Sequence, residues 1–146
     1  LLQALSPAAS ERMLEVGTGS GFMTACLAAL GGRVTSLEIL PELADMARTK
    51  LAAYRGAEVQ TMDVFGFAPA ERFDVIALTG SLPIYDRRFE DWLAVGGRLF
   101  VVSGNAPRME AHLVRRLAET EWATEILLET VVPQVMNAPR HQALNF

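Results

Sequence analysis

Three glycines at alternate positions, Gly17, Gly19 and Gly21, are the residues whose spacing points most clearly to chemistry. They follow a short apolar run and precede a stretch rich in alanine and leucine, which predicts a buried strand, a tight turn and a helix. Glycine suits such a turn because a Cβ would hold a ligand away from the main chain. Backbone N–H groups at the helix start also favour an anionic group. The turn, with Thr18 and Ser20 between its glycines, is therefore a candidate cofactor site.

Two kinds of cofactor bind at turns of this type, and two side chains bear on the choice. A dinucleotide site has Gly-x-Gly-x-x-Gly, in which the third glycine lets helix and strand pack closely. Here Phe22 stands at that third position, and the glycine lies one place earlier, at Gly21. Glu15 would repel a pyrophosphate but suits the ammonium and sulfonium groups of S-adenosylmethionine. We expect S-adenosylmethionine, with a nicotinamide-dependent oxidoreductase as the alternative.

Acidic residues follow the second and third predicted strands. Glu38 ends the second strand, 21 residues after Gly17, at the distance where an acid binds the ribose hydroxyls of a nucleotide cofactor. We place Glu38 and the adjacent Ile39 in the site, although Glu38 could also simply solvate the strand end. Asp63 and Val64 follow the third strand, where Asp63 could accept a hydrogen bond from an adenine amino group or serve as a turn aspartate.

Strand-like and helical patterns alternate along most of the chain, as expected for a parallel sheet covered on both faces. The predicted strands are residues 13–16, 33–38, 58–62, 73–79 and 98–103. The predicted helices are residues 20–30, a helix that begins at residue 41, and residues 88–94 and 109–119. Gly96 and Gly97 are expected to form the turn that follows the third of these helices.

The last quarter of the chain has a different pattern. Residues 124–132 and 141–146 read as two strands joined by a loop without a crossover helix, which favours antiparallel pairing. The fold class we expect is therefore α/β: a doubly wound, mostly parallel, Rossmann-like sheet with a C-terminal antiparallel β-hairpin.

Length and composition restrict the possible function classes. A chain of 146 residues suits a single domain, here residues 1–146. The net charge of −4 argues against nucleic-acid binding through general charge. Cys26 is the only cysteine, so we expect neither an intramolecular disulfide nor a cysteine-built metal site. Because no apolar run approaches the roughly 20 residues of a membrane span, we expect a cytoplasmic protein without a membrane partner.

The N-terminal residues suggest a fragment. The chain opens without methionine, and Leu1, Leu2 and Leu5 already form one face of a helix. We therefore expect the domain to be truncated at its N-terminus. Neither composition nor motif indicates an oligomeric state.

Four stretches carry a family resemblance. They are MLEVGTGSGF (13–22), VTSLEILPELADMARTKL (34–51), FDVIALTGSLP (73–83) and LAVGGRLFVVSG (93–104). The chain resembles the protein-L-isoaspartate O-methyltransferase family over about residues 1–104. The resemblance implies methyl transfer from S-adenosylmethionine to the α-carboxylate of an isoaspartyl residue in a damaged protein or peptide. The family's hydroxyl-bearing N-terminal segment has no counterpart here, so another acceptor, or cofactor binding without turnover, stays an alternative.

The implied methyl transfer needs few catalytic side chains. A carboxylate acceptor, with a reference pKa of about 4, is already ionised at neutral pH and needs no general base. Positioning and exclusion of water can supply most of the acceleration. The candidates for the place where methyl group and acceptor meet are Thr79, Gly80 and Ser81, after the fourth strand, and a plain tight turn is the alternative. The catalytic residue itself remains open.

Overall fold

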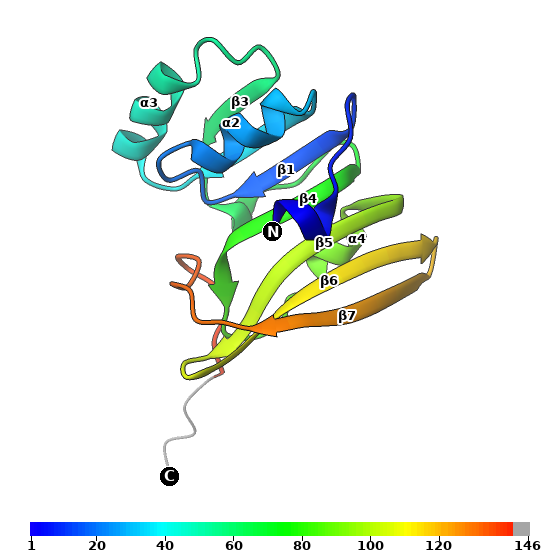
Figure 1. The fold of residues 1–146 in the computed structure, drawn as a ribbon. Helices are drawn as coiled ribbons and strands as arrows, with labels where there is room; N and C mark the ends of the chain where they lie inside the picture. The colour runs from blue at the N-terminus through cyan, green and yellow to red at the C-terminus, as the bar shows by residue number, and fades with distance from the viewer. Residues whose placement is uncertain (142–146) are drawn as a thin grey trace.

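The computed structural model describes residues 1–141 and contains one seven-stranded sheet (Figure 1). Its strands are β1 (Arg12–Val16), β2 (Arg33–Glu38), β3 (Ala57–Thr61), β4 (Phe73–Leu82), β5 (Leu93–Asn105), β6 (Arg108–Ala118) and β7 (Glu121–Glu129). Its helices are α1 (Leu2–Leu5), α2 (Phe22–Ala29), α3 (Pro41–Lys50), α4 (Arg88–Asp91) and the 3-10 turn η1 (Val64–Gly66). The strand order is β3-β2-β1-β4-β5-β6-β7. Strands β1 to β5 pair in parallel, and β5-β6-β7 are antiparallel.

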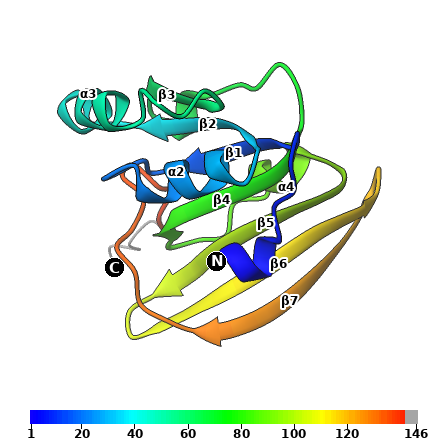
Figure 2. The same ribbon diagram turned by 45° about the horizontal axis from the view of Figure 1, so that its top comes forward.

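Helices pack on both faces of the sheet, because alternate residues of its central strands point in opposite directions (Figure 2). Met13 of β1 shares a buried cluster with Leu5 of α1 and Leu27 of α2. Leu14, the next residue of β1, belongs instead to the cluster that contains Phe89 of α4. The predicted α/β fold, doubly wound and mostly parallel with an antiparallel C-terminal end, is confirmed.

Helix α3 begins where the sequence predicts. Pro41 occupies its first turn, where the missing N–H costs nothing, and Glu42 complements the partial positive charge of the helix N-terminus. Its buried residues, Ala44 and Ala47, are small, so the helix lies close against the neighbouring elements. Only Ile39 and Leu40 separate α3 from Glu38, the last residue of β2, so this packing also holds the end of β2 in place.

The prediction of a helix over residues 109–119 is wrong, because this stretch forms strand β6. Its spacing of Leu113 and Leu117 suggested a helical face, yet Leu117 is exposed. In its first half the buried residues are Met109, Ala111 and Leu113, which repeat every second residue as in a strand, and Val114 and Arg116 are buried further along. Residues 108–115 of β6 pair with β5 through a tight hairpin.

The C-terminal antiparallel pair therefore lies earlier in the chain than predicted. Strand β6 pairs with β7, and residues 130–141 follow as a loop. The predicted final strand, residues 141–146, falls almost wholly outside the described residues. The expected turn at Gly96 and Gly97 is likewise a bulge inside β5, because the register between β4 and β5 shifts there and Gly96 has φ +85°.

A buried arginine holds the N-terminal helix to the sheet. Arg98 of β5 donates to the carbonyl oxygens of Leu5 at 2.6 Å and Ser6 at 2.7 Å. It also forms an ion pair with Glu11 at 2.6 Å. Among residues 1–141, no helix is long and apolar enough to cross a lipid bilayer.

Candidate cofactor site

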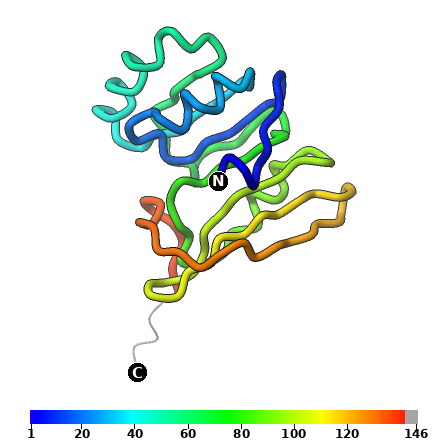
Figure 3. The backbone as a smooth tube through the Cα atoms, viewed as in Figure 1, coloured from blue at the N-terminus to red at the C-terminus, as the bar shows by residue number. Residues whose placement is uncertain are grey.

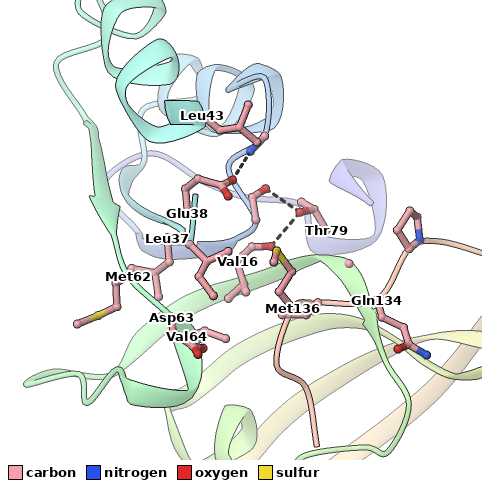
Figure 4. A pocket seen from close by; sticks show the side chains of 16 residues that line it. Val16, Leu37, Glu38, Leu43, Met62, Asp63, Val64, Thr79, Gln134 and Met136 are labelled. Atoms are coloured by element: carbon pink, nitrogen blue, oxygen red, sulfur yellow. Dashed lines mark hydrogen bonds between the residues drawn. The ribbon is translucent and has the colours of Figure 1, made fainter. Parts of the chain in front are cut away.

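A cavity of about 520 Å³ opens at the carboxyl ends of β1, β2 and β4 (Figure 4). Its size falls within the roughly 300–1,000 Å³ of pockets that bind small ligands. Eight of the residues predicted from the sequence line it: Gly17, Gly19, Glu38, Ile39, Asp63, Val64, Thr79 and Gly80. The parallel topology explains this convergence, since it brings the ends of non-adjacent stretches of chain to one edge of the sheet.

The glycine turn needs its glycines for two different reasons. Gly17 has φ +96°, and a Cβ there would lie 2.5 Å from the hydroxyl oxygen of Thr79. That hydroxyl lies 2.8 Å from the carbonyl oxygens of both Val16 and Gly17, to which it donates. Gly19 has φ +53°, and a Cβ there would meet nothing within 4 Å. Gly17 therefore leaves room for β4, whereas Gly19 leaves room in the cavity.

Glu38 connects the second strand to the glycine turn. Its side chain is almost fully buried, and its Oε2 accepts a hydrogen bond from the Gly19 N–H at 2.9 Å. Its Oε1 accepts from the Leu40 N–H at 3.2 Å. Since each carboxylate oxygen can accept more than one hydrogen bond, both can still receive a ligand hydroxyl. Figure 4 shows Glu38 beside the turn at the cavity wall.

Asp63 also lines the cavity, and both of its carboxylate oxygens accept hydrogen bonds. Its Oδ1 accepts from the Phe65 N–H at 2.9 Å and so caps η1. Its Oδ2 accepts from the side-chain amide of Asn137 at 2.9 Å. The contact with an adenine amino group stays a prediction, and it would use a remaining lone pair of this carboxylate.

The cavity is electrostatically suited to a cationic ligand. Its described lining residues include Glu38 and Asp63 but no lysine, arginine or histidine. A pyrophosphate placed there would face two carboxylates without a compensating cation. Among residues 1–141, no group of three His, Cys, Asp or Glu side chains could hold a metal ion.

Glu15 does not line the cavity, contrary to expectation. It has no exposed surface, because residue 15 of β1 points to the α2 face. Its Oε2 accepts from the hydroxyl groups of Thr24 and, at 2.8 Å, Ser36. The Ser36 hydroxyl lies 2.6 Å from that of Thr18, a residue of the glycine turn. Glu15 is thus linked to the glycine turn through hydrogen bonds of Ser36 and does not contact the cavity itself.

Burial also changes the acidity of Glu15. Desolvation raises the pKa of its carboxyl group to about 7, and the hydrogen bonds from Thr24 and Ser36 offset part of this rise. Among the described residues, Oε1 of Glu15 has no hydrogen-bond partner, which leaves one oxygen of the carboxylate uncompensated.

Four other predicted residues lie beside the cavity but do not line it. Thr18 is buried beneath the turn. Gly21 caps α2 and packs against Leu51. The Ser20 hydroxyl accepts a long hydrogen bond, 3.4 Å, from the Phe22 N–H. Ser81 is fully buried, and its hydroxyl donates to the carbonyl oxygen of Val132 at 3.0 Å, so it is not available where a methyl group and an acceptor would meet.

Sequence reasoning missed two groups of lining residues. The first group is apolar and lies close in sequence to the predicted residues: Val16, Leu37, Leu43 and Met62. Proximity to Gly17, Glu38 and Asp63 could have indicated them. The second group, residues 133–136, comes from the loop after β7 and has no local signal, since only the tertiary fold brings it to the cavity.

Comparison with known proteins identifies the family. A family model described as protein-L-isoaspartate(D-aspartate) O-methyltransferase matches residues 1–137. The chain belongs to this family. A protein-L-isoaspartate O-methyltransferase 1 from Anaeromyxobacter sp. is 42% identical over 104 residues, which cover 68% of this chain and 49% of the relative. The protein-L-isoaspartate O-methyltransferase of Methanoculleus marisnigri is 41% identical over 108 residues, or 72% of this chain and 48% of the relative.

The chain spans about half the length of these protein-L-isoaspartate O-methyltransferases. Solved structures agree with the fold. A structure titled protein-L-isoaspartate O-methyltransferase matches with a TM-score of 0.81 at 20% identity, over 91% of this chain and 44% of that one. A Plasmodium falciparum structure titled as a protein-L-isoaspartate O-methyltransferase in complex with S-adenosyl-L-homocysteine matches with a TM-score of 0.79 at 16% identity. The match covers 92% of this chain and 69% of that one.

Proposed function

We propose that this chain binds S-adenosylmethionine in the cavity and forms the cofactor-binding part of a protein-L-isoaspartate O-methyltransferase. The observation that carries the proposal is the contact of Glu38 with the Gly19 N–H at the cavity wall. It joins an acid suited to a ribose with a turn suited to the amino-acid end of the cofactor. The family's shared fold and sequence support the same assignment.

The residues present fit this cofactor. Leu37, Leu43 and Val64 offer apolar surface for an adenine ring, and Glu38 offers acceptors for the ribose hydroxyls. Gly19 leaves space for close approach to the main chain. The negative charge of Glu38 and Asp63 favours a ligand that carries a sulfonium and an ammonium group. When bound, S-adenosylmethionine supplies an activated methyl group.

The acceptor is the isoaspartyl α-carboxylate of a damaged protein or peptide. It is ionised at neutral pH, so the residues of this chain need only position it and exclude water. Thr79 is the residue we place nearest the reacting groups, because it lines the cavity and is fixed to the glycine turn. We also propose that residues 1–146 form a single domain and that the protein is cytoplasmic.

Methyl transfer to matched peptides tests this function. The protein that carries this chain should transfer labelled methyl groups from S-adenosylmethionine to an isoaspartyl peptide and not to the same peptide with aspartate. Transfer to neither peptide, with cofactor binding intact, would refute the proposed acceptor and favour another substrate or a binding-only protein. Absence of cofactor binding would refute the site itself.

A further inference from the structure

Residues 132–138, which we call the strap, are tied to the end of β4. The Ser81 N–H donates to the carbonyl oxygen of Pro133 at 2.8 Å, and the Val135 N–H donates to that of Ser81 at 2.9 Å. The Ser81 hydroxyl adds the contact with Val132. Backbone pairing and a buried side chain therefore fix the first half of the strap to the sheet. Figure 3 shows this part of the chain, coloured orange to red, doubling back beside β4.

The second half of the strap is bound to Asp63, another residue that lines the cavity. The side-chain amide of Asn137 donates to Oδ2 of Asp63 at 2.9 Å, and Asp63 lies two residues after the end of β3, the edge strand of the sheet. Strands β2 and β1 lie between β3 and β4. Between its contacts with Ser81 and Asp63 the strap borders the cavity at the ends of β1 and β2, where its residues 133–136 line the same space as Val16 and Glu38.

The strap supplies one wall of the cavity. Its residues 133–136 all line it, and Figure 4 shows Gln134 and Met136 there. The side chain of Met136 is 52% exposed, so this flexible apolar group can adjust its conformation where it lines the cavity. Asn137 itself does not line the cavity, and its φ of +62° is a left-handed conformation that asparagine tolerates better than most residues.

We propose that Asn137 is a positioning residue for the cofactor. Its amide holds the Asp63 carboxylate and keeps the strap across the adenosine end of the cavity, so that it slows cofactor release. This inference rests on the proposed function, since it concerns the same cavity. Asn137 acts only through Asp63 and the strap, and therefore governs the lifetime of the complex more than its rate of formation.

The test is the dissociation rate of S-adenosylhomocysteine from the Asn137→Gly variant. Glycine adopts φ +62° without strain, so this change removes the amide and leaves the backbone conformation available. Dissociation should be about tenfold faster, from the loss of a hydrogen bond to a carboxylate. Association should change little, and the thermal unfolding midpoint should stay close to that of the parent.

A matched control removes the same type of contact elsewhere. Gln60 donates its side-chain amide to Glu58 at 3.0 Å, on the exposed surface of β3 outside the cavity. Gln60→Ala should leave both rates unchanged. Asn137→Asp should release the ligand faster still, because it places a second carboxylate beside Asp63.

The outcomes separate this inference from the proposed function. A parent that binds S-adenosylhomocysteine, together with Asn137 variants that release it within twofold of the parent rate, would overturn the role of Asn137 alone. A folded parent that does not bind the ligand would overturn the proposed function and this inference with it.

Discussion

Glu38 and Gly19 meet through a hydrogen bond of 2.9 Å, from the backbone N–H of the turn to the carboxylate at the end of β2. The two residues are the most informative parts of the sequence pattern, and the fold makes them one structural unit. Glu38 consequently has two tasks, to shape the turn and to receive a ligand. Substitution of Glu38 should therefore affect binding more than the loss of a single ligand contact would.

Removal of the Glu38 carboxylate should weaken cofactor binding. Glu38→Ala is expected to reduce the affinity for S-adenosylhomocysteine by about 1–3 kcal/mol, because ligand hydroxyls and the Gly19 N–H lose their charged acceptor. Calorimetric titration measures this change. Glu42→Ala, which removes an exposed acid from the first turn of α3, serves as the charge-matched control. Equal affinities for parent and Glu38→Ala, with both proteins folded, would place the cofactor elsewhere.

A side chain at Gly19 should block the cavity. Gly19→Val is expected to weaken binding at least as much as Glu38→Ala, since the branched side chain enters the cavity from the turn. Gly96→Val is the matched control, because Gly96 also has positive φ and open space around it but lies in the β5 bulge. Both variants carry backbone strain of about 1–2 kcal/mol, and only Gly19→Val should lose binding. Similar losses of binding in the two variants would indicate that backbone strain, and not a side chain inside the cavity, causes the loss.

Glu15 should make stability depend on pH. Its pKa is about 7 in the folded protein and 4.5 as the ordinary value, so the folded state binds more protons between these values. Stability therefore decreases as pH rises through this window, by about 3 kcal/mol from this group alone. Urea unfolding from about pH 4 to about pH 8 should show this decrease relative to Glu15→Gln, which cannot ionise. Parallel pH profiles for the two proteins would contradict a buried, titrating Glu15.

Much of the fold could be predicted from local pattern, where that pattern reflects burial. Strands β1 and β2 are covered on both faces, so they appear in the sequence as apolar runs. These runs and the glycine turn between them were enough to predict where the candidate cofactor site lies. Strand β6 was mistaken for a helix because Leu113 and Leu117 fit a helical face. Only pairing with β5 and β7 shows that residues 108–118 follow a period of two.

The site was predictable at the strand ends and not beyond them. Gly19, Glu38 and Asp63 reach the cavity because parallel strands end at one edge. The direction of Glu15 depends on the pleat of β1, which turns that side chain away from the cavity. The strap could not be placed from sequence, because Asn137 and Asp63 are 74 residues apart and meet only through the tertiary fold.

The most direct test of the central claim is a calorimetric titration of the protein that carries this chain with two ligands, S-adenosylhomocysteine and NAD. We expect saturable binding of S-adenosylhomocysteine that Gly19→Val weakens, and no comparable binding of NAD, whose pyrophosphate would face Glu38 and Asp63 without a cation. Binding of NAD without a response to S-adenosylhomocysteine would contradict the central claim.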